Sequence, residues 1–275
     1  MIQNIYPHLF SNKFVVTSGI QENDHIFHFK GNSLLLKQND KEFEIPKKKH
    51  LGGHNPDGIF LFTLNNVNCF LVWDCPEPDN NRFTYQEINY FRTILQKEIS
   101  WAGVVGYQLM NWYSQNKFCG KCGIPTVLKN DERAIICPSC QTTVYPKISP
   151  AIIVAILCND KILLAQGVSF RSSFYSLVAG YADIGESLED AVVREVKEEV
   201  GLDIKNIRYY KSQPWPFSGS MMIGFIAEAD DTQPISIDKK EIINAAWFTR
   251  GNLPIHPVAI SIAGEIIEKF EKKEL

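Results

Sequence analysis

The sequence predicts an α/β fold for the second half of the chain, preceded by a small cysteine module and an α+β domain. Apolar strand-like runs follow Pro150 and lead into a helix that begins near Ser187. Two Cys-x-x-Cys pairs lie in the middle of the chain, and strand patterns precede helical ones in the first hundred residues. We place the domain boundaries at 1–115, 116–146 and 147–275.

The N-terminal domain reads first as strands and then as helices. Short apolar runs bounded by polar residues predict the strands, and Asn65-Asn66 is expected to form a hairpin turn between two of them. Apolar residues at helical spacing then predict helices over 85–96 and 99–112, the second leading into the cysteines. The expected strands are 13–16, 26–30, 33–36, 58–64 and 68–73.

The middle of the chain carries two Cys-x-x-Cys pairs, with 14 residues between the second and third cysteine. This spacing predicts one structural Zn²⁺ per chain, bound tetrahedrally by four thiolates. A redox-active Cys-x-x-Cys is the alternative. The expected ligands are Cys119, Cys122, Cys137 and Cys140, whereas Cys69, Cys75 and Cys158 lie in apolar contexts and are expected to be packed thiols.

The C-terminal domain is expected to place buried strands at 151–157, 161–167 and 174–181, and a closing helix at 259–270. Between them, Ser187 and a following Asp190 form a capping-box start, and Gly201 is a helix stop. Apolar residues recur every four positions within this helix and make one buried stripe, at Leu188, Val192, Val196 and Val200.

The opposite face of the same helix is acidic. Glu195, Glu198 and Glu199 are separated by three and four residues, so they share one face. Like charges this close destabilise a helix unless hard divalent cations with oxygen ligands lie between them. The face is therefore a candidate cation site, and a solvated acidic surface is the alternative.

Composition excludes several classes of protein. The longest apolar run, 151–158, is far shorter than the roughly 20 residues that a membrane span needs, and residues 1–10 lack a signal-peptide pattern. A net charge of −3 does not attract the negatively charged backbone of a nucleic acid. Any RNA is therefore expected to be recognised at its end. Seven cysteines, mostly clustered, fit a reducing compartment, and the C-terminal KKEL is not a peroxisomal signal, so we expect a cytoplasmic protein with no membrane contact.

The acidic helix and its approach match a known motif. The spacing G-x5-E-x7-R-E-hydrophobic-x-E-E-x-G-hydrophobic resembles the Nudix box, and its fixed positions are Gly180, Glu186, Arg194, Glu195, Glu198, Glu199 and Gly201. Downstream, residues 212–217 read SQPWPF and resemble the signature of the NADH pyrophosphatase branch of the Nudix family. The resemblance covers 113–270 well and the first hundred residues in outline. It implies a Nudix α/β/α sandwich with a mixed sheet, preceded by a four-cysteine zinc ribbon and an N-terminal α+β degenerate Nudix-like domain.

The resemblance also implies roles for individual residues. Catalytic Mg²⁺ or Mn²⁺, more than one per site, would be held by the carbonyl of Ala179 and by Glu195, Glu199 and Glu241, with Glu198 orienting or deprotonating the attacking water. Ser218 stands where the branch usually has proline. The implied substrate-binding residues are Glu132, Tyr145, Gln213, Pro214, Trp215, Pro216, Phe217, Ser218, Gly219, Ser220 and Ala263.

The activity implied by this resemblance is hydrolysis of the pyrophosphate of NAD(H) to AMP and nicotinamide mononucleotide. Removal of the NAD cap from RNA 5′ ends is implied as well, and so is a homodimer. Two alternatives stay open. One is a Nudix hydrolase acting on another nucleoside diphosphate derivative, and the other is a zinc-ribbon protein that senses a nucleotide without cleaving it.

Overall fold

A computed structural model of the chain describes all residues except 40–41, 53, 76–81, 95 and 169–173. The described residues form two compact units. The C-terminal unit holds Met1, 148–215 and 219–275, and the N-terminal unit holds 2–147 and 216–218. None of the described helices combines the length and apolarity that crossing a bilayer requires.

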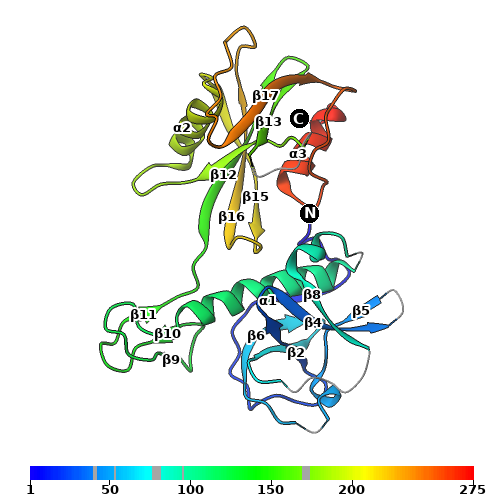
Figure 1. Cartoon of the computed structure of the whole chain (residues 1–275), viewed down its shortest axis with the longest axis vertical. Helices are drawn as coiled ribbons and strands as arrows, with labels where there is room; N and C mark the ends of the chain where they lie inside the picture. The colour runs from blue at the N-terminus through cyan, green and yellow to red at the C-terminus, as the bar shows by residue number, and fades with distance from the viewer. Residues whose placement is uncertain (40–41, 53, 76–81, 95, 169–173) are drawn as a thin grey trace. The chain divides into compact units, whose positions relative to one another are not determined.

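The C-terminal unit is built on a six-stranded mixed sheet with the order β15-β16-β12-β13-β17, and β14 also pairs with β12 (Figure 1). The central strand β12 runs parallel to β16 and antiparallel to β13 and β14. The strands are β12 (Ser149–Cys158), β13 (Lys161–Gly167), β14 (Val178–Tyr181), β15 (Lys205–Trp215), β16 (Ser220–Glu228) and β17 (Ile242–Thr249).

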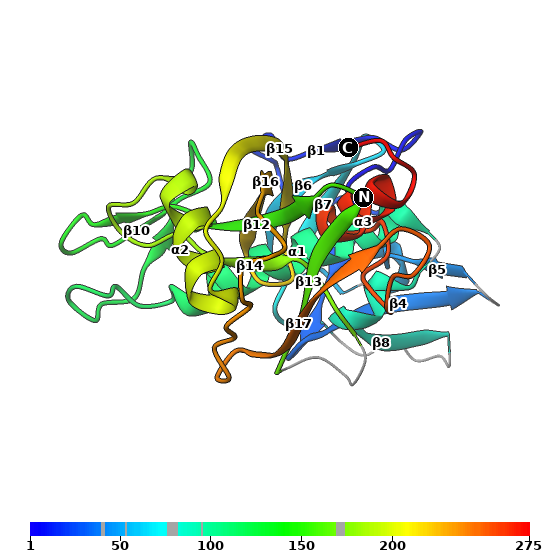
Figure 2. The ribbon, with the colours of Figure 1, turned by 90° about the horizontal axis from the view of Figure 1, so that it is seen from above.

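Two helices cover opposite faces of this sheet, α2 (Leu188–Val200) and α3 (Ile262–Glu271) (Figures 1 and 2). Strand β12 supplies both interfaces because successive side chains point to opposite faces. Ile152 and Val154 share a buried cluster with α2, whereas Ile153 and Ala155 share another with α3. The predicted α/β/α sandwich with a mixed sheet is confirmed.

The N-terminal unit contains two four-stranded sheets, the long helix α1 (Lys97–Gln115) and a three-stranded ribbon. One sheet has the order β1-β6-β7-β2, with β1 (Phe10–Ser11), β6 (Gly58–Leu64), β7 (Val67–Val72) and β2 (His25–Phe27). In the other sheet, β4 (Ser33–Asn39) pairs with each of the remaining strands, which are β3 (Phe29–Lys30), β5 (Glu42–Glu44) and β8 (Phe83–Glu87). The ribbon strands are β9 (Val127–Leu128), β10 (Ile135–Ile136) and β11 (Thr143–Val144), and the 3₁₀ turns are η1 (Lys48–His50) and η2 (Ile88–Arg92).

Several expected elements are confirmed, and two are wrong. Strands 33–36 and 58–64, helix 99–112 and the hairpin turn form as predicted, with φ of 51° and 62° at Asn65 and Asn66. Residues 13–16 do not form a strand. The strand nearest to them, β1, ends at Ser11. The helix expected at 85–96 is instead strand β8 followed by η2, and residue 95 lies outside the described residues. Pairing of β8 with β4 overrides the local helical spacing.

The C-terminal expectations differ only at their edges. Over 174–181 the continuous strand is limited to β14, while Phe174 and Ser176 form isolated bridges. The last helix begins at Ile262, three residues after its predicted start, because the Ser261 side chain caps it by accepting a hydrogen bond from the Gly264 amide at 3.2 Å.

Candidate active site and zinc centre

Helix α2 is fixed at both ends by its own sequence. Ser187 Oγ accepts a hydrogen bond from the Asp190 amide at 3.1 Å, and the Asp190 carboxylate accepts one from the Ser187 amide at 3.2 Å. This is the predicted capping box. Gly201 ends the helix with φ of 76°, a left-handed conformation that glycine adopts without a Cβ penalty. The acidic side chains between these caps are therefore held on a defined helical face.

The three glutamates of this face differ in exposure. Glu195 and Glu199 are only 9% and 6% exposed, whereas the Glu198 side chain is 59% exposed. Gly180 on β14 makes room for Glu195, because a Cβ at that position would lie 2.0 Å from the Glu195 carboxyl carbon. A side chain at position 180 would therefore displace the Glu195 carboxylate from its present position.

Arg194 connects the carboxylates of the loop and the helix. Its guanidinium donates to both oxygens of Glu186, at 3.0 and 2.6 Å, and to Glu195 at 2.8 Å and Glu198 at 3.1 Å. It also donates to the Tyr181 carbonyl at 2.9 Å. The hydrogen bond from Arg194 lowers the pKa of Glu186 to about 2, and Glu186 in turn accepts a hydrogen bond from the Asp183 amide. Arg194 and Glu186 thus brace the loop that precedes α2.

Glu199 receives no such compensation from the described side chains. It lines a cavity of about 330 Å³ together with Ala179 and Glu241. Burial, followed by repulsion from Glu195, Glu241, Asp238 and Glu198, raises the pKa of Glu199 to about 8. A buried carboxyl among other carboxylates is stabilised by a positive ion, and the donors around it are oxygens. This donor set fits a hard divalent cation.

The structure brings three of the four predicted cation ligands, Ala179, Glu199 and Glu241, to this one cavity. The fourth, Glu195, lies four residues before Glu199 on α2 and contributes to its raised pKa. Asp238 is an acidic neighbour that the sequence interpretation missed. Its only sequence signal is a second carboxylate three residues before Glu241.

The SQPWPF segment forms the end of β15 and a turn into β16. Gln213 is fully buried, and its amide group accepts a hydrogen bond from the Ile262 amide at 2.6 Å and donates one to the Ile260 carbonyl at 2.9 Å. It therefore fastens the start of α3, where Ala263 is also buried. Ser220 is buried on β16, and its hydroxyl lies 3.2 Å from that of Tyr181.

The turn itself covers 216–219 and uses Gly219 at φ of 71°. It follows Pro214 and Trp215, which form the last two residues of β15. Residues 216–218, which include the exposed Ser218, belong to the N-terminal unit. Within that unit, the guanidinium carbon of Arg92 lies 4.1 Å from the ring centroid of Phe217. Sequence reasoning did not single out Arg92, because nothing local to it marks a partner so distant in the chain.

Two predicted substrate residues of the N-terminal unit contact each other. The Tyr145 hydroxyl donates to Glu132 Oε1 at 3.1 Å, and this interaction raises the pKa of Tyr145. Lys129 Nζ lies 2.5 Å from the same Glu132 oxygen. Glu132 is therefore held by a cation and a phenol on the ribbon.

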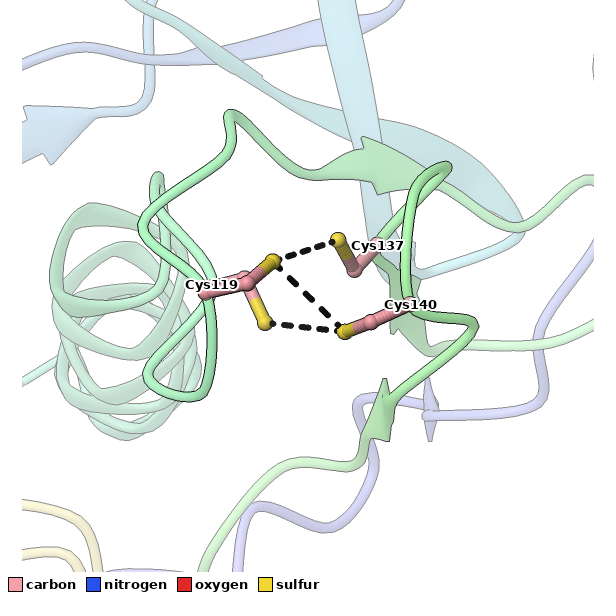
Figure 3. A group of neighbouring side chains, drawn as sticks. Cys119, Cys137 and Cys140 are labelled. Carbon is pink, nitrogen blue, oxygen red and sulfur yellow. Dashed lines mark hydrogen bonds between the residues drawn. The ribbon is translucent and has the colours of Figure 1, made fainter.

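The four predicted zinc ligands converge on one point of the ribbon. Figure 3 labels three of them, Cys119, Cys137 and Cys140. Sulfur separations are 3.5 Å for Cys119 to Cys140, 3.5 Å for Cys122 to Cys137 and 3.6 Å for Cys122 to Cys140. Four sulfurs placed about 2.3 Å from a tetrahedral Zn²⁺ would be roughly 3.8 Å apart. The arrangement fits zinc and is too open for a disulfide.

The two cysteine turns have matching backbones. Gly123 follows the second cysteine of the first pair with φ of 75°, and Gln141 follows that of the second pair with φ of 58°. The Gly123 amide donates to the Cys119 carbonyl at 2.8 Å, and the Gln141 amide to the Cys137 carbonyl at 3.0 Å. Each turn therefore presents two sulfurs on one side. This closed, fourfold set favours a structural ion over redox chemistry.

Three family models match consecutive parts of the chain. Residues 147–270 match the NUDIX domain, 23–112 match the NADH pyrophosphatase-like rudimentary NUDIX domain, and 114–145 match the NADH pyrophosphatase zinc ribbon domain. The chain therefore carries a NUDIX domain, preceded by a zinc ribbon domain and a rudimentary NUDIX domain, both of NADH pyrophosphatase type.

Over part of its length the chain is similar to bacterial proteins. The chain is 45% identical over 163 residues to the NAD-capped RNA hydrolase NudC of Klebsiella pneumoniae (strain 342) and 46% identical to that of Salmonella paratyphi C (strain RKS4594). Each match covers 59% of this chain and 63% of the relative, so it spans less than two thirds of those proteins. A crystal structure of a NUDIX hydrolase from Nitrosomonas europaea matches 57% of this chain and 91% of its own at 21% identity, with a TM-score of 0.49.

Proposed function

We propose that the chain hydrolyses the pyrophosphate bond of NAD(H) to give AMP and nicotinamide mononucleotide, and that it also removes NAD from the 5′ end of RNA. Support comes from the Nudix domain, from the two upstream domains of NADH pyrophosphatase type, and from relatives named NAD-capped RNA hydrolase. A homodimer belongs to this proposal through the family resemblance alone. A cytoplasmic location belongs to it because four free zinc-binding thiols persist in a reducing compartment.

One observation carries the proposal, the cavity that Glu199 shares with Glu241 and Ala179. In the absence of a cation, a pKa of about 8 keeps the Glu199 carboxyl mostly protonated at neutral pH, whereas a bound cation would stabilise its charged form. Bound Mg²⁺ or Mn²⁺ would neutralise the diphosphate and lower the pKa of a water that attacks phosphorus. We expect more than one ion per site, because Glu195 and Glu199 each offer two oxygens.

The acidic residues and Arg194 would have different roles in this mechanism. Glu195, Glu199 and Glu241, with the carbonyl of Ala179, would hold the cations. Glu198 is the exposed member of the acidic face and would orient the attacking water or take its proton. Arg194 is engaged by three carboxylates, so it would keep their geometry rather than bind phosphate. This division leaves the positive charge for the diphosphate to the metal ions.

Substrate recognition would use the end of β15, the turn after it, and residues of the ribbon. Trp215 and Phe217 offer flat faces for a base or a nicotinamide ring. Glu132, held by Lys129 and Tyr145, offers a carboxylate acceptor for a polar group of the dinucleotide. Gln213 and Ala263 are buried against the start of α3, so their contribution would be to shape the site from behind.

The deciding experiment measures AMP release from NADH by the zinc-loaded full chain, with and without added Mg²⁺ or Mn²⁺. We expect cleavage that requires the added cation. The same assay with an ADP-sugar and a dinucleoside polyphosphate tests the substrate class. Faster cleavage of either compound would make the chain a Nudix hydrolase of that other class, and binding of NADH without release of AMP would make it a sensor.

A further inference from the structure

The N-terminal unit contains a second cavity, far smaller than a dinucleotide site. Its volume is about 210 Å³, below the roughly 300–1,000 Å³ of clefts that enclose a drug-sized ligand, so it suits a single ring system. Its walls come from the first sheet, the end of α1 and the zinc ribbon, which lie together in Figure 1. The lining residues are Ile59, Trp73, Tyr113, Asn116, Lys117, Thr126, Val127, Leu128 and Ile135.

The chemistry of this cavity combines a flat aromatic ring with one positive charge. Trp73 is 42% exposed, and Lys117 Nζ lies 4.8 Å from its ring centroid. Lys117 is the one charged side chain among the described lining residues and makes no ion pair within the described part of the chain. Val127 and Leu128 add exposed apolar surface at the rim. An unpaired ammonium over a half-exposed indole therefore favours a ligand that is both planar and anionic.

We propose that this cavity binds one unstacked base of single-stranded RNA, with Trp73 as the stacking surface and Lys117 as the contact to a neighbouring phosphate. Bases without a partner stack on aromatic side chains, and lysine binds phosphate as a point charge. The lysine stem is flexible, so its ammonium can move from the indole to a phosphate when a base takes its place.

The inference deepens the proposed function, since it gives the RNA body of an NAD-capped transcript a contact that free NADH lacks. A net charge of −3 over the whole chain predicts weak binding along an RNA backbone. A local site for one nucleotide would let the protein hold RNA in spite of that charge. NADH and capped RNA would then share the catalytic site and differ at this cavity.

The test uses the zinc-loaded full chain and two independent readouts. The first is the affinity for a fluorescent single-stranded RNA that has a 5′ phosphate and no cap, measured by anisotropy in the catalytically impaired background Glu199→Gln. The second is kcat/KM for NADH and for an NAD-capped RNA of the same sequence. The variants are Trp73→Ala, Trp73→Phe and Lys117→Gln, and Lys121→Gln is the control for an exposed ribbon lysine outside the cavity.

We expect Trp73→Ala to weaken RNA binding and capped-RNA cleavage about ten-fold, with NADH cleavage unchanged, and Trp73→Phe to restore most of the loss. Lys117→Gln should lower the salt dependence of RNA binding by about 0.7 in the log–log slope, as one lost phosphate contact on a single strand predicts. Lys121→Gln should leave both quantities unchanged.

Three outcomes would overturn the proposal. RNA affinity that is unchanged in both cavity variants would do so, and so would an equal loss on NADH and capped RNA. A change of oligomeric state in Trp73→Ala, seen by light scattering, would mean that the cavity receives a protein surface. The anisotropy measurement does not depend on turnover, so a chain that cleaves neither substrate would refute the proposed function and still decide this one.

Discussion

The zinc centre on the ribbon and the candidate cation site on the Nudix domain differ in how their ligands are arranged. On the ribbon, four sulfurs from two matching turns surround one point, with the three measured separations between 3.5 and 3.6 Å, so the ligand set is closed. On the Nudix domain, the buried Glu199 and the exposed Glu241 line a cavity of about 330 Å³, so the ligand set is open. A closed set stabilises a fold, whereas an open one leaves coordination positions for substrate and water. The comparison predicts that losing each ion has a different consequence.

The largest effect is expected from breaking the closed set. Cys137→Ser removes a fully buried ligand, and zinc sites of this kind contribute on the order of 10 kcal/mol of binding free energy to folding. We expect loss of the one zinc per chain and a fall of the melting temperature on the order of 10 °C or more. Metal analysis and calorimetry measure both quantities.

The matched control for that variant is Cys158→Ser, which changes a cysteine outside the cluster. It should keep the zinc and stay within a few degrees of the parent chain. If Cys137→Ser kept its melting temperature after losing the ion, the ribbon would not depend on zinc, and the contrast between the two centres would fail.

Breaking the open set should abolish turnover without unfolding the chain. Glu199→Gln keeps the shape of the side chain and removes a charge that the cation requires. We expect at least about a hundred-fold loss of NADH cleavage, comparable to removing one preorganised electrostatic contact from an active site. Glu189→Gln, an exposed glutamate on the same helix, should retain nearly full activity. A well-folded Glu199→Gln that cleaves NADH normally would remove Glu199 from the site.

The sequence was sufficient to predict the parts whose signals are local. The capping box at Ser187, the stop at Gly201 and the two cysteine turns each lie within a few residues, and the structure has all of them. The helix expected at 85–96 failed because its apolar spacing competes with the pairing of Tyr85 to Leu35, which is 50 positions distant. Pairing between residues so far apart cannot be predicted from the pattern of a short stretch of sequence.

The same distinction applies within the candidate active site. Glu195 and Glu199 could be predicted from their spacing on one helix, and Glu241 only through the family resemblance. The contribution of Asp238 to the raised pKa of Glu199 comes from a loop that meets α2 in three dimensions. Likewise, the hydrogen bonds of Gln213 to the start of α3 are set by packing and could not be read from the SQPWPF string.

The raised pKa of Glu199 predicts a smaller effect, a dependence of the melting temperature on pH that comes from the candidate cation site alone. Its folded pKa of about 8 exceeds the ordinary value of 4.5, so the folded state binds this proton more tightly than the unfolded state. The stability contributed by the group is fully present below pH 4.5 and is lost as the pH rises through 8. In zinc-loaded protein without Mg²⁺, Glu199→Gln should therefore melt a few degrees higher than the parent chain at pH 8, and this gap should be much smaller at pH 5. Added Mg²⁺ should close the gap at pH 8, and a gap that is independent of pH would contradict the assigned shift.

The smallest expected effect concerns how α2 is held when no cation is bound. The sulfurs of the ribbon turns converge on one point, where they would bind an ion, but the start of α2 is fixed by the hydrogen bond between Ser187 Oγ and the Asp190 amide. Ser187→Ala removes an N-cap worth about 1 kcal/mol, so the melting temperature should fall by about 2–4 °C both with and without Mg²⁺. Ser18→Ala, at an exposed serine for which the structure records no side-chain hydrogen bond, should change neither value. If added Mg²⁺ fully rescued Ser187→Ala, the cation rather than the cap would set the start of the helix, and the open centre would resemble the closed one after all.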